Sequence, residues 1–161
     1  MREILEILEK DARTTPEEIA KILKKNVSAV KKAIKKFEKD GVIVKYKTVL
    51  NKELIRDDAR GVRALIEVRI APERGHGFDH IAERIYRFPE VASCYLLSGT
   101  YDLLLVVEGK DIHEVSHFVS ERLATLDNVR GTVTHFLLKK YKEDGDILKR
   151  AERNKRIAIT F

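Results

Sequence analysis

The sequence predicts an α+β fold with an N-terminal helix-turn-helix head, a connecting strand and a C-terminal ferredoxin-like βαββαβ sandwich that dimerises. Three observations predict it. Apolar residues recur at helical spacing three times in the first 40 residues. From residue 62 the pattern reads strand, helix, strand, strand, helix, strand, and the third of these strands is apolar towards both faces. We expect a head over 1–50, a linker over 51–61, a body over 62–142 and a tail strand over 143–161.

Local signals mark where the helices of the head begin. A first short helix ends near residue 11. The run Thr15-Pro16-Glu17-Glu18 predicts the start of a second, because threonine caps a helix, proline suits its first turn and glutamate completes a capping box. Asn26 is placed to cap a third helix after a tight turn. Two short helices joined in this way indicate a helix-turn-helix.

The third helix has an apolar stripe and a lysine face. The stripe consists of Val27, Val30, Ala33, Ile34 and Phe37, and the opposite face carries Lys31, Lys32, Lys35, Lys36 and Lys39. Glu38 is the only acidic residue before Asp40 ends the helix. A face with one sign of charge is typical of a phosphate-binding surface. The alternatives are a merely solvated face, or the ion-pair networks of heat-stable proteins, which intersperse both signs of charge.

The chain leaves the head through Val42–Leu50, whose β-branched and aromatic residues predict a strand. In the body, Ala64, Ile66, Val68 and Ile70 alternate with polar residues as a half-buried strand. A helix follows with the stripe Phe78, Ile81, Ala82, Ile85 and Phe88. Residues 91–97 and 101–107 predict a hairpin around the turn 98–100. A second helix has the stripe Ile112, Val115, Val119, Leu123 and Leu126, and a strand over 129–140 completes the body.

The apolar pattern of the body predicts that two copies of it form a dimer. Two helices cover only one face of a four-stranded sheet, yet Leu103–Val107 are apolar towards both faces. A second copy of the same sheet would cover the other face, so we expect a dimer. The alternating tail Arg156–Phe161 predicts a strand that pairs with a sheet edge of its own chain or of its partner.

Charge and composition narrow the class of protein. Of the net charge of +6, most lies in the first third: residues 1–50 hold 13 Lys and Arg against 8 Asp and Glu, and the remainder hold 19 against 18. This asymmetry indicates a nucleic-acid-binding head on a near-neutral body. No apolar run reaches the length of a membrane span, and the single Cys94 forms no internal disulfide, so we expect a cytoplasmic protein.

Taken together, these features resemble the Lrp/AsnC family of transcription regulators, the leucine-responsive, asparagine-responsive or feast/famine proteins. The resemblance rests on I-A-K-x-L in the second helix, E-K-D-G-V-I at the end of the third, C-Y-L-L-S-G-T-Y-D-L-L-L, V-R-G-T-V-T and the tail N-K-R-I-A-I. It implies a prokaryotic or archaeal regulator that binds double-stranded DNA. It also implies a homodimer that often assembles into octamers, with the body over 62–142 binding an amino acid or a related effector.

Two departures from the family pattern concern the head. The family usually has glycine where Lys24 stands, which bears on the geometry of the turn. Its third helix usually carries arginine, whereas this chain has no arginine between Arg13 and Arg56. Arginine binds guanine bidentately, whereas lysine acts as a point charge on phosphate. We therefore expect DNA affinity dominated by phosphate contacts and a modest readout of bases.

Two sets of site residues follow. The DNA-binding candidates are Asn26, Ser28, Lys31, Lys32, Lys35 and Lys36. The effector-binding candidates are Ser98, Gly99, Thr100, Tyr101, Asp102 and Thr134. In the effector site, Asp102 would accept the ammonium group of an amino acid, and backbone N–H groups around Gly99 and Thr100 would bind its carboxylate. A plain hairpin turn is the alternative.

No cofactor, metal or catalytic residue is expected, and the chain is not predicted to be an enzyme. The segment His113-Glu114-Val115-Ser116-His117 matches the zinc-peptidase pattern H-E-x-x-H. The helix stripe turns both histidines towards solvent, however, and no third ligand is evident. Two other functions stay open: a ligand-insensitive architectural DNA-binding protein, and a metabolic enzyme or enzyme-regulatory subunit that uses the ferredoxin-like body.

Overall fold

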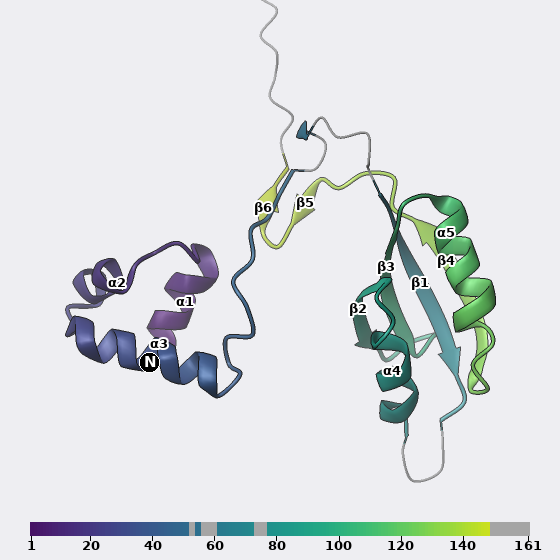
Figure 1. Ribbon diagram of the computed structural model, residues 1–161, viewed down its shortest axis with the longest axis horizontal. Helices are drawn as coiled ribbons and strands as arrows, with labels where there is room; N and C mark the ends of the chain where they lie inside the picture. The colour runs from purple at the N-terminus through teal and green to yellow at the C-terminus, as the bar shows by residue number, and fades with distance from the viewer. Residues whose placement is uncertain (52–53, 56–60, 73–76, 149–161) are drawn as a thin grey trace, which may run out of the picture. The chain divides into compact units, whose positions relative to one another are not determined.

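The computed structural model describes residues 1–51, 54–55, 61–72 and 77–148. The chain divides into two compact units, Met1–Leu50 and Asn51–Phe161 (Figure 1). The first unit is helical and the second contains the sheet, so the α+β class is confirmed. In the described residues, no helix is long and apolar enough to cross a membrane.

The head consists of α1 (Arg2–Lys10), α2 (Pro16–Leu23) and α3 (Val27–Lys39). The predicted capping box is present: the Glu18 amide donates to Thr15 Oγ1 at 3.3 Å, and the Thr15 amide donates to Glu18 Oε2 at 2.7 Å. The three helices bury one apolar cluster made of Ile4, Leu8, Ile19, Ala20, Val30, Ala33 and Ile34. This cluster fixes α3 against the other two helices and decides which face of α3 meets solvent.

The turn between α2 and α3 contains a left-handed lysine. Lys24 has φ 52° and ψ 43°, a conformation that suits glycine because it has no Cβ. The Lys24 amide donates to the carbonyl of Lys21 at 3.4 Å, and the Lys25 amide donates to that of Ala20 at 2.9 Å. These two bonds form a Schellman motif. The departure from glycine at this position therefore keeps the turn but leaves a strained lysine in it.

The strand predicted over Val42–Leu50 is wrong for this chain. The helix α3 ends before this segment: Gly41 adopts φ 71°, and the Ile43 amide donates a hydrogen bond to the carbonyl of Phe37 at 3.0 Å. Residues 44–50 have no regular secondary structure. A strand forms only when a second segment pairs with it in register, and the local residue pattern does not supply that segment.

The body contains β1 (Val62–Ile70), α4 (Asp79–Tyr86), β2 (Val91–Leu96), β3 (Leu103–Gly109), α5 (Ile112–Phe118), the π-helical η2 (Val119–Leu123) and β4 (Val129–Phe136). Its four strands form an antiparallel sheet in the order β2-β3-β1-β4 (Figure 1). The βαββαβ prediction is thus confirmed. Two short strands, β5 (Lys142–Glu143) and β6 (Asp146–Ile147), form a separate hairpin. The predicted tail strand Arg156–Phe161 lies outside the described residues.

Both helices pack on one face of the sheet. That core consists of Ala64, Ile66, Val68, Ile70, Ile81, Ile85, Leu103, Leu105, Val107, Val115, Phe118 and Leu123. Phe118 packs edge-on against Phe88, with ring centroids 5.5 Å apart. The predicted stripe is corrected at one position, because Ile112 is 52% exposed next to the N-cap Asp111 and Phe118 fills the core instead.

Among the described residues, the core of the body lies on the helix-covered face alone, and we call the other face of the sheet the open face. Cross-strand partners share a face, so the pairings of Leu104 with Glu67 and Tyr95, and of Val106 with Leu65, place these side chains together. Leu65, Leu104 and Val106 are half-buried, and Tyr95 is 51% exposed. The apolar character of β3 towards both faces is therefore a real feature of the structure.

Candidate nucleic-acid interface and ligand site

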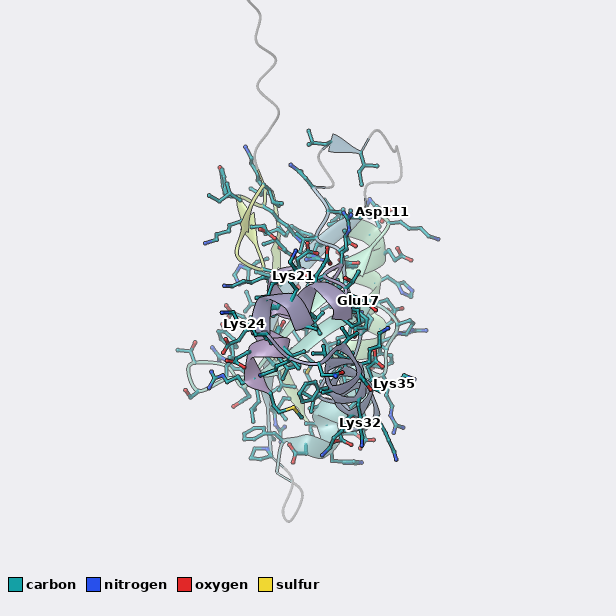
Figure 2. The ribbon with its side chains drawn as sticks, turned by 90° about the vertical axis from the view of Figure 1, so that its left-hand side faces the viewer. Glu17, Lys21, Lys24, Lys32, Lys35 and Asp111 are labelled. Atoms are coloured by element: carbon teal, nitrogen blue, oxygen red, sulfur yellow. The ribbon has the colours of Figure 1, made fainter. Side chains whose placement is uncertain are left out.

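The outer face of α3 carries a single row of side chains opposite the core. Val30, Ala33 and Ile34 are buried on the inner side. Ser28, Lys32, Lys35 and Lys39 lie opposite them at i, i+4, i+7 and i+11, and all four are exposed. We call these four residues the outer row. Figure 2 shows Lys32 and Lys35 on α3 and, for orientation, Glu17 and Lys24 at the two ends of α2.

Two other lysines are paired with acids from earlier helices. Lys31 Nζ lies 2.6 Å from Glu17 Oε1 on α2, and Lys25 Nζ lies 2.6 Å from Glu3 Oε2 on α1. The hydrogen bond from Lys31 holds the pKa of Glu17 below its ordinary value, because the ammonium group favours the charged carboxylate. In contrast, Lys32, Lys35 and Lys36 have no carboxylate within ion-pair distance in the described part of the chain.

The two polar candidates at the start of α3 have structural tasks. Asn26 caps the helix, since its Oδ1 accepts a hydrogen bond from the Ser28 amide at 2.8 Å. The Ser28 hydroxyl belongs to the outer row and faces solvent. Of the six DNA-binding candidates, Ser28, Lys32 and Lys35 thus lie in the outer row and Lys36 is exposed beside it, whereas Asn26 caps α3 and Lys31 is paired with Glu17. Sequence reasoning did not find the acids Glu17 and Glu3, which are distant in sequence from the lysines that they contact, and it left Lys39 of the outer row out of the DNA-binding candidates.

The predicted effector turn connects β2 to β3. The Leu97 amide donates to the carbonyl of Asp102 at 2.9 Å and closes the loop. Ser98, Gly99 and Thr100 are exposed, and Tyr101 is half-buried. A Cβ built on Gly99 would meet no atom within 4 Å. Its lack of a side chain is therefore not required inside the single chain, and the space beside it is open.

Asp102 ties this turn to the neighbouring strand. Its amide donates to the carbonyl of Val68 at 3.0 Å, and its Oδ2 accepts a hydrogen bond from the Ile70 amide at 2.7 Å. The contact falls where the register of β1 against β4 shifts between Arg69 and Ile70. Within the described residues, Oδ1 accepts no hydrogen bond. One carboxylate oxygen therefore has a structural partner, and the other accepts no hydrogen bond from the described residues.

Thr134 does not join the turn within one chain, which corrects the expectation that it lies nearby. Thr134 lies on β4, where it pairs with Ile66 of β1, and β4 is two strands away from β3. The turn, in contrast, lies at the level of Ile70. Four residues of strand correspond to roughly 13 Å. Pairing register, which the sequence pattern leaves undetermined, sets this separation.

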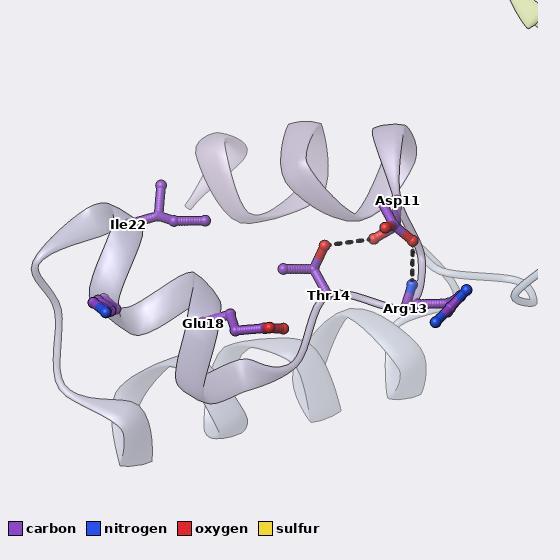
Figure 3. A pocket seen from close by; sticks show the side chains of 6 residues that line it. Asp11, Arg13, Thr14, Glu18 and Ile22 are labelled. Atoms are coloured by element: carbon purple, nitrogen blue, oxygen red, sulfur yellow. Dashed lines mark hydrogen bonds between the residues drawn. The ribbon is translucent and has the colours of Figure 1, made fainter.

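A hollow lies in the head, between the end of α1 and α2 (Figure 3). It is lined by Asp11, Arg13, Thr14, Glu18, Lys21 and Ile22 and has a volume of about 400 Å³. Asp11 holds its rim together, because Asp11 Oδ1 accepts from the Arg13 amide at 2.9 Å and its carbonyl accepts from Thr14 Oγ1 at 2.9 Å. Five of the six lining residues are exposed, so the hollow is shallow and separate from the effector candidates.

The H-E-x-x-H segment lies on α5 with both histidines exposed. Glu114 belongs to the helix start: its amide donates to Asp111 Oδ1 at 2.8 Å, and its carboxylate accepts from the Lys110 amide. The described residues contain no group of three potential metal ligands. The glutamate that would act as a general base in a zinc peptidase is thus engaged in capping.

A helix-turn-helix with a basic outer row, joined to an antiparallel sheet domain, defines a two-domain DNA-binding regulator. Residues 1–44 match the family described as winged helix-turn-helix DNA-binding, and residues 63–147 match the Lrp/AsnC ligand binding domain. The chain belongs to the Lrp/AsnC family of transcription regulators and is not an enzyme.

Individual relatives agree with this assignment. An uncharacterised HTH-type transcriptional regulator of Bacillus subtilis, YugG, is 48% identical over 98% of this chain and 95% of its own length. The HTH-type transcriptional regulator FL11 of Pyrococcus furiosus is 30% identical over 91% of this chain and 92% of its own. Among solved structures, a transcriptional regulator of Neisseria meningitidis in complex with L-methionine superposes with a TM-score of 0.68. It is 28% identical, and the match covers 88% of this chain and 89% of that one.

Proposed function

We propose that this protein regulates transcription by binding duplex DNA through the outer row of α3 and by responding to an amino acid bound at the turn after β2. The observation that carries the DNA-binding half is the outer row itself, in which the ammonium groups of Lys32, Lys35 and Lys39 face solvent opposite a buried apolar stripe. Ammonium groups on one side of a helix can neutralise the phosphates that flank a groove.

Phosphate contacts account for the affinity of such a surface. Each neutralised phosphate releases condensed counterions, so binding weakens steeply as salt increases. With roughly four to eight phosphate contacts per dimer, affinity should fall by orders of magnitude between low and moderate salt. Because α3 carries lysine and no arginine, its contacts favour the backbone over the bidentate reading of guanine.

The test is a salt titration of duplex binding with the double variant Lys32→Ala/Lys35→Ala. We expect weaker binding to all sequences alike and a flatter dependence on salt. The matched control is Lys10→Ala/Lys110→Ala, which removes the same charge from exposed positions outside α3. An unchanged salt slope in the α3 variant, or an equal loss in the control, would refute the assignment of these lysines to phosphate.

The effector half rests on the turn that contains Asp102. A free amino acid needs an acceptor for its ammonium group and donors for its carboxylate. Asp102 Oδ1 has no partner in the described residues, and the exposed Ser98, Gly99 and Thr100 offer backbone N–H groups. The L-methionine complex of the Neisseria meningitidis relative supports an amino acid as the class of ligand. Isothermal titration calorimetry of the full chain with each of the twenty amino acids tests whether one of them binds. If none of them binds, the effector half of the proposal is wrong.

The ligand site is proposed to be completed by assembly. Leu65, Leu104 and Val106 on the open face form an apolar strip beside exposed Tyr95, and a second copy of the sheet would cover it. A dimer also presents two heads to DNA, and further association of dimers into an octamer would present eight. A ligand that binds one assembly state better than another would alter head spacing and hence DNA affinity.

One observation favours a second function. The outer row contains lysine and serine alone, which suits a sequence-tolerant architectural protein as well as a regulator of a particular operator. Comparison of random and self-promoter DNA, with and without amino acids, separates the two functions. In either function the protein binds chromosomal DNA, and we place it in the cytoplasm of a prokaryotic cell.

A further inference from the structure

The lysines of the head fall into two electrostatic classes. Those of the outer row face solvent without an acidic partner in the described residues, whereas Lys31 is held by Glu17 at 2.6 Å. Lys31 lies close to the outer row, because it is one helical turn before Lys35 on the same surface of α3. Its charge would therefore sit at the rim of the DNA-facing surface if Glu17 did not neutralise it.

The position of Glu17 on α2 explains why the pair forms. Glu17 lies in the first turn of α2, where a carboxylate interacts favourably with the positive end of the helix dipole. Because α2 and α3 pack through their buried stripe, this turn comes within ion-pair distance of Lys31. Neighbouring Glu18 cannot take the same part, since its carboxylate is engaged by the amide and hydroxyl of Thr15.

We propose that Glu17 is an intramolecular competitor of DNA phosphate for Lys31, and that it limits the sequence-independent affinity of the head. This rests on the DNA-binding half of the proposed function. A phosphate that approaches Lys31 must displace the Glu17 carboxylate, and the carboxylate also repels the DNA backbone. The sequence-tolerant affinity that an all-lysine helix would confer is thereby reduced at one contact in each head, while the outer row keeps its contacts.

The competition predicts an increase in affinity when the acid is removed. In Glu17→Gln the side chain keeps its size but loses its charge, which frees Lys31 for phosphate. Exposed ion pairs are weak, so we expect non-specific duplex binding to tighten by roughly 1.5- to 5-fold for each engaged head. One more phosphate contact should steepen the slope of log affinity against log salt by about 0.9 per head.

A double-mutant cycle in the full chain isolates the pair. Lys31→Ala alone should leave the salt slope unchanged, because Lys31 makes no phosphate contact while Glu17 holds it, and should weaken binding slightly, because the Glu17 carboxylate is then unpaired. In the Glu17→Gln background, Lys31→Ala should cancel the gain. Glu6→Gln is the matched control, because it removes one acid that pairs with Arg2 on α1 and should leave the slope unchanged. Circular dichroism checks that the variants keep their helices.

The outcomes separate this inference from the function beneath it. If the wild type binds no duplex, the proposed function fails. If the wild type binds and Lys32→Ala/Lys35→Ala weakens binding, but Glu17→Gln leaves affinity unchanged or lowers it, the function stands and the competition is wrong. A gain in Glu17→Gln that persists when Lys31 is also removed would likewise overturn it, because the effect would then be general repulsion rather than competition for Lys31.

Discussion

The carboxylate of Asp102 accepts a hydrogen bond from the Ile70 amide at 2.7 Å and so joins the turn after β2 to the bulge at the end of β1. Asp102 is thus both the proposed ammonium acceptor and a structural link. Replacing it with alanine would disturb both roles at once, so a substitution that removes only the charge is the more informative probe.

Asp102→Asn should separate the two roles. The asparagine amide oxygen can still accept from the Ile70 amide, whereas the neutral side chain no longer compensates an ammonium group. We expect stability within about 0.5 kcal/mol of wild type, and loss of amino-acid binding by calorimetry with ligand-free DNA binding retained. Asp102→Ala should in addition lose about 1–3 kcal/mol of stability, because the half-buried Ile70 amide loses its acceptor. If Asp102→Asn binds amino acids as tightly as wild type, the effector site is misplaced.

Lys24→Gly should stabilise the head. Lys24 holds φ 52°, and a left-handed conformation costs an L-residue roughly 1 kcal/mol that glycine avoids. Part of this gain is offset by the greater freedom of glycine in the unfolded chain. We expect slower amide hydrogen exchange in α2 and α3, by up to about fivefold, and no gain in Lys24→Ala, which keeps the Cβ. Equal exchange in both variants would show that the strain has no energetic consequence.

A charge on the open face should disrupt assembly. Leu104 pairs with Glu67 and Tyr95 there, and in a dimer Leu104→Asp would bury an unpaired carboxylate at high cost. Sedimentation should show wild type as a dimer or larger and this variant as a monomer with unchanged helical circular dichroism. Lys110→Asp in an exposed loop serves as the charge control. A wild type that sediments as a stable monomer would remove the assembly proposal.

Cys94 should react slowly in the native protein. It pairs with Leu105 on the covered face, and burial raises the pKa of its thiol above the ordinary value. At pH 8 a smaller fraction is thiolate than in a free cysteine, so alkylation by iodoacetamide should be slower than in urea-unfolded chain and should accelerate as pH rises. Native and unfolded rates that coincide at pH 8 would contradict this placement of the thiol.

Sequence reasoning placed the local features well, because neighbours along the chain determine them. The capping box of Thr15 and Glu18 and the cap at Asn26 depend on contacts within four residues, and the apolar stripe of α3 depends on a spacing that repeats every three or four residues. The βαββαβ order could also be predicted, since periodicity distinguishes strands from helices and few topologies accommodate that order. The strand predicted over Val42–Leu50 failed because residue type cannot supply a pairing partner.

What the sequence alone determined is therefore which residues become the helices, their caps and the four strands of the body, and that lysines line the outer side of α3. The tertiary structure decided which distant groups meet. It paired Lys31 with Glu17, bound Asp102 to Ile70, set Thr134 apart from the turn, and buried Phe118 in place of Ile112. These outcomes depend on strand register and on the packing of whole elements against each other, so a change of one residue in register would reassign every contact across the sheet.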